Sequence, residues 1–227
     1  AQGKTHEKMA CGDKKARFRT VILDPLLTES VPRSVAAATG IDAIAHAVES
    51  YVSTSRNHIS QMFALKAWEL LERCFERIFA ESATIEARSR MLLGAHLAGA
   101  AIETAMLGAA HACANPLTAR YGITHGVAVG LMLPEVIRFN GRAEPELYRE
   151  LTVHWANADP EEGVARLVDR IVKLKATAGL PERLRDLQVN RNMLSLMAKE
   201  AAQQWTGTFN PRPVAENEFL QLYKAVY

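Results

Sequence analysis

Apolar residues recur at helical spacing along most of the chain. Five large apolar residues in the stretch that follows Asn57 stand at intervals of three and four: Leu65, Trp68, Leu71, Phe75 and Ile78. This spacing places them on one face of an amphipathic helix. Asn57 immediately precedes the stretch, and asparagine is a favoured N-cap residue. The pattern therefore predicts a helix that begins after Asn57 and packs one face against a core.

Comparable patterns, punctuated by proline, threonine and glycine, predict the remaining helices. After Pro32, one helical piece is expected to end at Gly40 and a second to run from Ile41 to Val52. Further helices are expected at residues 85–107, 144–155, 161–178, 193–204 and 216–225. No internal repeat and no flexible linker separates them, so we expect one mainly helical domain.

Only the beginning of the chain has the pattern of β structure. Residues 19–24 form a short run rich in β-branched side chains, which ends at Asp24-Pro25. An isolated strand pair is not stable alone, so the partners of this strand are expected outside the chain. The prediction is a mainly α fold, with a multi-helix domain at residues 28–227 and a β stub within residues 1–27.

Composition and charge exclude several classes of protein. The 227 residues include 27 basic and 25 acidic side chains, a net charge of +2 that provides no strong field for nucleic acid or anionic membranes. Hydrophobic residues make up 48% and charged residues 23%, as in ordinary globular proteins. The odd number of cysteines (Cys11, Cys74 and Cys113) and the polar first residues indicate a reducing, cytoplasmic location.

One segment has the length of a membrane span. Residues 91–117 contain a single formal charge, Glu103. The segment is rich in alanine and glycine rather than in large aliphatic residues, and it contains His96, His111 and Asn115. This composition favours a helix packed on all sides inside a helical domain, and we expect no membrane association.

Asp42 and His46 are the first candidates for chemistry. They stand four residues apart in an otherwise apolar stretch, which puts their Cβ atoms roughly 6 Å apart on one helical face. A carboxylate and an imidazole at this spacing can share a metal ion. The same spacing also allows Asp42 to accept a hydrogen bond from a protonated His46, so the spacing alone leaves both interpretations open.

His111 and His125 favour the metal-site interpretation over a simple hydrogen bond between Asp42 and His46. Both lie in apolar surroundings, where an unpaired imidazole costs about 1–3 kcal/mol, and a shared cation would satisfy both. The break at Asn115-Pro116 indicates two separate helices whose ends or faces meet. One carboxylate and three imidazoles suit Fe(II), Zn(II), Mn(II), Co(II) or Ni(II) rather than Ca(II), and no thiolate is placed to join them.

Two long segments resemble a known family. DPLLTESVPRSVAAATGIDAIAHAVESYVS and GAAHACANPLTARYGITHGVAVGLMLPEVIRFN are similar to the C-terminal helical domain of the iron-containing (group III) alcohol dehydrogenases. The resemblance is densest from Asp24 to Asn140. It implies a dehydroquinate synthase-like C-terminal fold and a catalytic metal, usually Fe(II) and Zn(II) in some members. Matched by motif, the metal ligands would be Asp42, His46, His111 and His125.

The sequence departs from this family in two ways. Many members have a histidine near the substrate and the nicotinamide at the position of Asn115, the one candidate catalytic residue outside the metal ligands. Asparagine cannot relay a proton; alternatively, Asn115 caps a helix that begins at Pro116. The second departure is that the chain has no glycine-rich phosphate loop. The β stub is therefore expected to be the remnant of a missing nucleotide-binding domain, and the chain a fragment.

The function expected from the resemblance is that of the metal domain of an alcohol dehydrogenase. The intact enzyme would convert a small alcohol into an aldehyde or ketone with hydride transfer to NAD(P), and it would form a homo-oligomer, a dimer. The fragment alone is expected to be inactive. A first alternative is a non-catalytic helical module that binds metal or self-associates. A second is a metal hydrolase, for which Glu49 and Glu103 are weak candidate bases. Cofactor-binding residues cannot be identified, and the choice between NAD and NADP stays open.

Overall fold

Helices account for the fold. The computed structural model describes residues 15, 18–80, 83–153 and 159–227. Within these ranges the chain forms no β-strand and has the following α-helices: α1 (Arg33–Val52), α2 (His58–Cys74), α3 (Ile85–Ala105), α4 (Ala109–Tyr121), α5 (His125–Gly141), α6 (Arg149–Thr152), α7 (Pro160–Thr177), α8 (Leu194–Ala201) and α9 (Glu216–Ala225). The predicted mainly α fold is confirmed.

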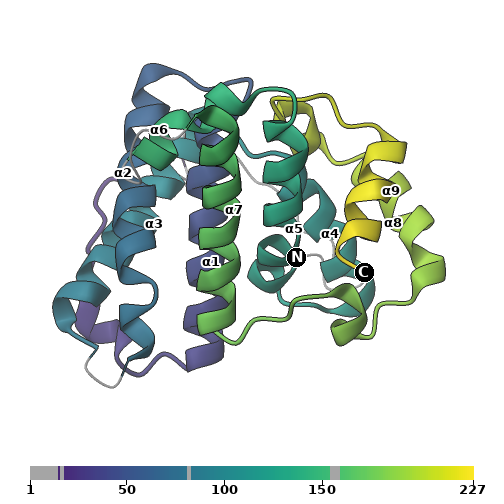
Figure 1. Ribbon diagram of the computed structural model, residues 1–227. Coiled ribbons are helices and arrows are strands. Elements are labelled where there is room, and N and C mark those ends of the chain that lie inside the picture. Colours follow the sequence, from purple (N-terminus) through teal and green to yellow (C-terminus); the bar gives the residue numbers. More distant parts are fainter. Residues whose placement is uncertain (1–14, 16–17, 81–82, 154–158) are drawn as a thin grey trace.

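Helix α1 is the centre of the packing. It contacts α2 and α3 on one side and α5 on the other. Helix α5 in turn contacts α4, α7 and α9, and α8 packs against both α4 and α9. Figure 1 shows these two groups of helices side by side, with α1 to α3 at the left and α4, α5, α8 and α9 at the right. Helix α1 thus lies where the two groups meet, and most of its residues are buried.

Several predicted helix boundaries are confirmed. Asn57 caps α2, because its side-chain oxygen accepts from the Ser60 amide at 3.0 Å and Ser60 Oγ accepts from the Asn57 amide at 2.9 Å. Helix α9 covers the predicted residues 216–225, and α7 is displaced from its predicted range by one residue. These helices have clear amphipathic patterns and local end signals, which is why the sequence locates them well.

The prediction of two helices on either side of Gly40 is wrong. Helix α1 continues without a break from Arg33 to Val52. A Cβ atom at Gly40 would lie 2.6 Å from the ring of Phe75, so glycine at this position makes room for a neighbouring side chain. Close packing, not a helix end, explains this glycine.

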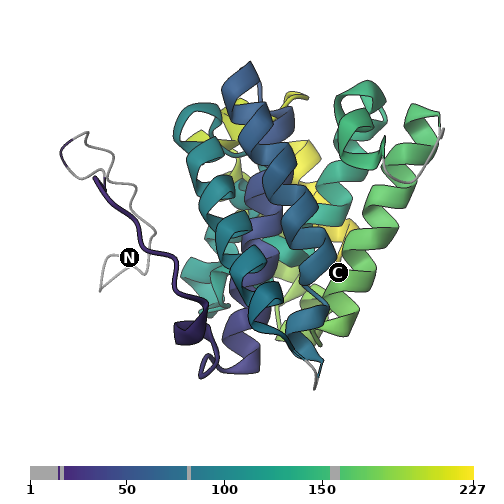
Figure 2. The same cartoon turned by 90° about the vertical axis from the view of Figure 1, so that its left-hand side faces the viewer.

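The β stub is not found in the described residues. Residues 18–24 form no strand, and in Figure 2 this segment, at the left, leads away from the helices. Its apolar side chains are exposed, with Phe18 at 82% and Ile22 at 86%. A strand needs a partner for its backbone groups, and none of the segments that the structure describes provides one. The predicted boundary between residues 27 and 28 falls inside the 3-10 helix η2 (Pro25–Thr28).

Two other predicted helices are shorter than expected. The helix predicted at 144–155 is replaced by the 3-10 helix η4 (Pro145–Tyr148) followed by the four-residue α6; its predicted end lies outside the described residues. The helix predicted at 193–204 begins with the 3-10 helix η7 (Arg191–Met193), and α8 ends at Ala201.

The alanine-rich segment does not form one straight helix. Within the described ranges, no single helix is long and apolar enough to cross a membrane, although α3 and α4 reach that length together with a bend of 104° between them. The bend follows Met106, which has a positive φ of 64°.

Candidate metal centre and adjoining cavity

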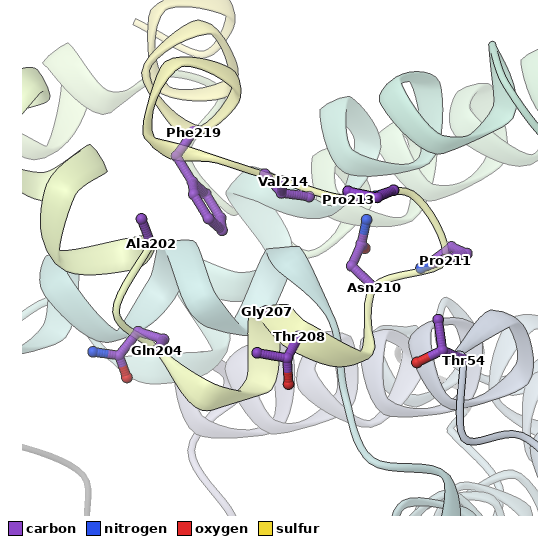
Figure 3. A pocket seen from close by; sticks show the side chains of 10 residues that line it. All are labelled: Thr54, Ala202, Gln204, Gly207, Thr208, Asn210, Pro211, Pro213, Val214 and Phe219. Atoms are coloured by element: carbon purple, nitrogen blue, oxygen red, sulfur yellow. The ribbon is translucent and has the colours of Figure 1, made fainter.

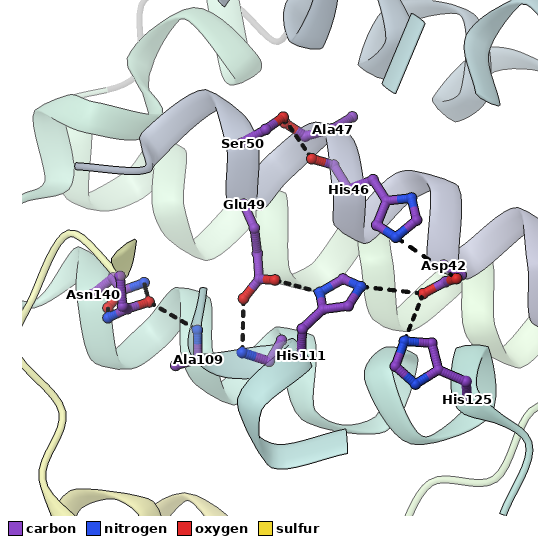
Figure 4. A network of polar contacts seen from close by, with 11 residues as sticks. Asp42, His46, Ala47, Glu49, Ser50, Ala109, His111, His125 and Asn140 are labelled. Atoms are coloured by element: carbon purple, nitrogen blue, oxygen red, sulfur yellow. Dashed lines mark hydrogen bonds and ion pairs between the residues drawn. The ribbon is translucent and has the colours of Figure 1, made fainter. Parts of the chain in front are cut away.

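Asp42 and His46 lie one turn apart on α1, on the side that faces α4 and α5 (Figure 4). The Oδ2 atom of Asp42 is 3.8 Å from Nε2 of His46, and each side chain is 21% exposed. This distance exceeds that of a hydrogen bond. The simple alternative, in which Asp42 accepts a hydrogen bond from His46, is therefore not what the structure has.

His111 reaches the same carboxylate from the first turn of α4. Its Nε2 atom lies 3.4 Å from Oδ1 of Asp42. On the other side of the ring, Nδ1 lies 2.5 Å from Oε2 of Glu49, which is itself 4% exposed (Figure 4). The second carboxylate oxygen of Glu49 accepts from the amide of Ala110 at 2.7 Å. Both oxygens of Glu49 are thus used to hold the start of α4 and the His111 ring.

His125 completes the group as the first residue of α5. Its Nε2 atom is 3.9 Å from Oδ1 of Asp42. The chain turns between α4 and α5 at Gly122, whose φ of 64° is in the left-handed region that favours glycine. The next glycine, Gly126, packs against α1 so tightly that a Cβ atom there would lie 1.9 Å from the carbonyl oxygen of Ala38. This contact brings the start of α5 up to Asp42.

The break between these helices is not where the sequence predicted it. Helix α4 runs through Pro116, and the chain turns at residues 122–124 instead. Asn115 therefore lies inside a helix and cannot cap one that begins at Pro116. Contacts of α4 with α5 and α8 support the helix across the proline, which itself lacks a hydrogen-bond donor.

All four sequence-predicted ligands converge. Asp42, His111 and His125 can each offer one donor atom within 4.8 Å of the others. His46 stands beside this group, with its ring stacked on that of His111 at 4.9 Å between centroids, and the rings of His111 and His125 are 5.4 Å apart. Three helices that are separate in the sequence thus bring one carboxylate and three imidazoles together.

The electrostatics of the cluster favour bound positive charge. Burial by itself raises the pKa of Asp42, but the contact with His111 and the three nearby imidazoles hold it far below its ordinary value. Burial lowers the pKa of His111, but the charges of Glu49 and Asp42 outweigh burial and raise it to about 9. The site therefore stabilises a carboxylate and a cation at the same place, even though His111 is almost fully buried.

The donor set also fits a divalent metal ion. In the described part of the structure, Oδ1 of Asp42 and Nε2 of His111 are buried atoms that make no hydrogen bond, and they face each other. The contact with Glu49 keeps a proton on Nδ1 of His111, so Nε2, which faces Asp42, is the nitrogen that can exchange its proton for a metal ion. A carboxylate and neutral imidazoles are the ligands that iron and zinc take in proteins.

Glu49 is the residue that the sequence analysis undervalued. The sequence indicates only a weak candidate base or a solvated or structural residue, and the structure has Glu49 buried and hydrogen-bonded. Glu103, the other candidate base, is exposed at the edge of the neighbouring cavity. The available signal was spacing: Glu49 stands seven residues after Asp42 and three after His46 on an otherwise apolar helix, which puts all three on one face.

A cavity of about 390 Å³ opens next to the cluster. His46, His111 and His125 line one part of it. Apolar side chains line another: Ile102, Met106, Leu107 and Trp205. Asn115 and Thr206 also line the cavity, and Asn115 Nδ2 donates to Oε1 of Gln204 at 2.9 Å. The cavity can accommodate a small organic molecule directly beside the candidate metal ligands.

A second pocket, of about 320 Å³, involves the same segment, the 3-10 helix η8 (Trp205–Phe209). Figure 3 shows that it is lined by polar, proline and apolar side chains from η8, from the segments on either side of it, from Phe219 on α9 and from Thr54. No ionisable side chain lines this pocket. The histidine-lined cavity is therefore the better candidate for chemistry.

Comparison with known proteins identifies the family. The model of the Fe-containing alcohol dehydrogenase family, C-terminal, matches residues 36–227. The 1,3-propanediol dehydrogenase of Citrobacter freundii is 34% identical over 210 residues, which are 91% of this chain and 54% of that protein.

Two solved structures have the same arrangement of helices. An alcohol dehydrogenase from Oenococcus oeni has a TM-score of 0.85 at 29% identity, over 89% of this chain and 54% of that chain. A sulfoacetaldehyde reductase from Bifidobacterium kashiwanohense, solved in complex with NAD+, has a TM-score of 0.81 at 28% identity, over 89% and 53%. The chain spans about half the length of the curated relatives that it matches. It belongs to the Fe-containing alcohol dehydrogenase family, to whose C-terminal part it corresponds.

Proposed function

We propose that this chain is the metal-binding half of an NAD(P)-dependent alcohol dehydrogenase, with Asp42, His46, His111 and His125 as the ligands of one divalent ion. The observation that carries the proposal is the convergence of three imidazoles on one carboxylate beside a cavity of about 390 Å³. We propose Fe(II) as the resident metal and Zn(II) as the alternative, because this mixed donor set suits both.

The chemistry of the intact enzyme would combine two bound groups with the cavity. When bound, the metal supplies Lewis-acid polarisation of an alcohol or carbonyl oxygen, and NAD(P) exchanges hydride with the adjoining carbon. Within this chain, Glu49 holds the proton at Nδ1 of His111 and so keeps Nε2 available as a ligand. The apolar side chains of Ile102, Met106 and Leu107 exclude water from the substrate.

Asn115 is proposed to contact the substrate rather than to transfer a proton. It lines the cavity one helical turn after His111. An amide side chain has no titratable proton at neutral pH. Any proton released by the alcohol must therefore leave through another group or through water, and Asn115 orients the reactants.

The metal hydrolase alternative requires a general base, and Glu49, the nearest candidate, is not available for this role. Both oxygens of Glu49 are engaged, one with His111 and one with the amide of Ala110. A general base needs a free acceptor within reach of the attacking water. The non-catalytic module stays a distinct alternative, because it would bind the same metal without turning over an alcohol.

The remaining expectations about the whole protein are proposals too. Residues 1–27 are proposed to be the end of a nucleotide-binding domain, which would cover the exposed apolar side chains of Phe18 and Ile22. We also propose a homodimer, which sedimentation velocity can test. A cytoplasmic location is in keeping with Cys74 and Cys113, which are free thiols.

Metal analysis of matched variants tests the proposal. The chain is loaded with Fe(II) under anaerobic conditions or with Zn(II), freed of loose metal and analysed by elemental mass spectrometry. We expect one ion per chain, retained in His96→Ala, whose histidine is exposed on α3, and lost in His125→Ala. Undiminished metal in His125→Ala would contradict the ligand assignment. NAD-dependent oxidation of an alcohol by the full-length protein separates the dehydrogenase from the non-catalytic module.

A further inference from the structure

The end of η8 meets the start of α4. Asn210 directly follows η8, and Figure 3 shows its side chain beside this 3-10 helix. Its Oδ1 atom accepts from the amide of Ala109, the first residue of α4, at 3.3 Å. The next amide, that of Ala110, donates to Oε1 of Glu49 at 2.7 Å. The first amides of a helix have no partner within the helix, so these two side chains bind the two amides that precede His111.

Gly108, the residue before α4, packs against both acceptors. It is the N-cap of the helix and offers no side-chain acceptor of its own. A Cβ atom at this position would lie 2.9 Å from Oε1 of Glu49 and 3.1 Å from Oδ1 of Asn210. The two oxygens thus approach the backbone at the start of α4 more closely than a side chain at residue 108 would allow, and they replace the missing cap.

A buried hydrogen-bond network holds the Asn210 amide in one orientation. Its Nδ2 atom donates to the carbonyl oxygen of Arg212 at 2.6 Å and to Oδ1 of Asn140 at 2.7 Å. In return, Nδ2 of Asn140 donates to Oδ1 of Asn210 and to the hydroxyl oxygen of Tyr148, both at 3.1 Å. Asn140 is 2% exposed and Asn210 4% exposed. A flipped Asn210 amide would face the carbonyl of Arg212 with an oxygen and the amide of Ala109 with a donor, so the network fixes Oδ1 as the acceptor.

This network joins the three helices that carry the proposed metal ligands. Glu49 belongs to α1, Asn140 to α5, and the Ala109 amide to α4 (Figure 4). Asn210 also connects these helices to η8, whose first two residues line the histidine-lined cavity. Buried polar networks whose members are all satisfied make a structure rigid. The rigid region here adjoins the turn of α4 that contains His111.

We propose that Asn210 is a positioning residue for the metal centre: by capping α4 beside Glu49, it fixes the first turn of the helix and thereby places the His111 ring against Asp42. This inference rests on the proposed function, in which His111 is a ligand, and extends it to a side chain outside the ligand set. His111 is the third residue of α4, within the turn that depends on the cap. A ligand must be held to within about 0.5 Å of its productive position, so a first turn that shifts or frays weakens metal binding.

The zinc affinity of matched variants, measured by competition with a chelator, tests the proposal. Asn210→Ala removes the acceptor for Ala109, and we expect the affinity to fall about tenfold, as for residues that orient a metal ligand. Asn140→Ala leaves Oδ1 of Asn210 in place and should cause a smaller loss. The control is Trp68→Phe, which removes a buried hydrogen bond to the carbonyl oxygen of Leu151 from α2, a helix without proposed ligands. It should change the affinity by less than about twofold.

The ring of His111 provides a readout that general destabilisation does not move. In the metal-free wild-type chain with ¹⁵N-labelled histidine, we expect NMR to show a proton on Nδ1 of His111 that is bound to Glu49 and exchanges slowly with water. In Asn210→Ala this signal should broaden or disappear, and the amide of Ala109 should exchange faster. Trp68→Phe should retain the Nδ1 signal and the slow amide exchange. Urea unfolding curves establish that each variant is folded under the conditions of measurement.

The outcomes separate the positioning role from the proposed function. An unchanged zinc affinity in folded Asn210→Ala, or an unchanged signal of the His111 Nδ1 proton, overturns the positioning role while the metal site stands. An equal loss of affinity in Trp68→Phe also overturns it, because the effect is then one of overall stability. A wild-type chain that binds no zinc contradicts the proposed function, and the Nδ1 signal and amide exchange of the metal-free chain then decide the positioning role. If Asn210→Ala does not fold, Asn140→Ala decides by the same measurements.

Discussion

His111 on α4 and Lys175 on α7 are both buried side chains that can carry a positive charge. His111 is 2% exposed and Lys175 is 7% exposed. Burial disfavours the charged form of each, yet their pKa values move in opposite directions. The pKa of His111 rises to about 9, whereas burial lowers that of Lys175 from 10.5 to about 8 despite the nearby charges of Glu182 and Glu135.

The difference lies in what surrounds each group. His111 has a carboxylate on each side of its ring, from Glu49 at 2.5 Å and from Asp42 at 3.4 Å. Among the described residues, Lys175 forms no ion pair within 4 Å. A buried charge is tolerated only where partners compensate its desolvation. The region around α1 is thus arranged to hold a cation, and a metal ion can take the place of the proton on His111.

Replacing His111 should have the largest effect. His111→Ala removes a proposed ligand and leaves the buried carboxylate of Glu49 and the partly buried carboxylate of Asp42 without their shared partner. We expect this to cost about 3–5 kcal/mol of stability as well as the bound metal. Urea unfolding of the metal-free chain and elemental analysis measure the two effects. If His111→Ala keeps both its metal and its stability, the carboxylates around His111 do not compensate a buried charge, and His111 does not differ from Lys175 in this respect.

Glu49→Gln tests the origin of the difference more selectively. The glutamine amide has one oxygen, which can accept either from the Ala110 amide or from Nδ1 of His111, but not from both. Its NH₂ group then faces whichever of these two donors is left, and the tautomer of His111 is disturbed. We expect metal affinity to fall about tenfold to a hundredfold, measured by competition with a chelator. Glu103→Gln, at the exposed edge of the cavity, is the control and should bind metal normally.

Gly126→Ala tests the position of His125 without changing any charged group of the cluster. The added methyl group would meet the carbonyl oxygen of Ala38 at 1.9 Å, so α5 must move away from α1 and carry His125 with it. We expect a loss of about 1–3 kcal/mol in stability together with weaker metal binding. Gly99→Ala on α3, where a Cβ atom meets nothing within 4 Å, should lose neither. Unchanged metal affinity in Gly126→Ala would mean that the close contact does not position His125.

Lys175→Met should have a smaller effect and the opposite sign. Because the pKa of Lys175 is lower in the folded chain than in the unfolded chain, the unfolded state binds more protons between about pH 8 and 10.5. Wild-type stability therefore gains a contribution as the pH rises through this window. The variant lacks this dependence and should be more stable at pH 7 by on the order of 1–2 kcal/mol. Parallel urea unfolding curves at pH 7 and pH 10 check it; lower stability at pH 7 would contradict the assignment.

Local signals predicted the parts of this molecule that depend on local physics. The Asn57 cap and the helix at residues 216–225 follow from end signals and amphipathic spacing. The i, i+4 spacing of Asp42 and His46 predicts that their side chains share one helical face. The convergence of His111 and His125 was inferred from two imidazoles in apolar surroundings, and the structure brings them to Asp42.

Packing between distant segments could not be predicted in the same way. Gly40 looks like a helix end in the sequence, but its role is to accept the ring of Phe75, which lies 35 positions later. Pro116 looks like a helix start in the sequence, but α4 continues through it and is supported there by contacts with α5 and α8. Glu49 is only a weak candidate base in the sequence, but its role is to hold His111, which lies 62 residues later. Each error concerns a residue whose role is set by a neighbour remote in sequence.

The central claim is that one ion is shared by Asp42, His46, His111 and His125. Anomalous diffraction at the zinc edge from crystals of the zinc-loaded chain tests it most directly. We predict a single strong peak about 2.0–2.2 Å from a carboxylate oxygen of Asp42 and from Nε2 of each histidine. A peak that excludes His111 or His125, or a zinc ion bound elsewhere with these four side chains apart, would contradict the account.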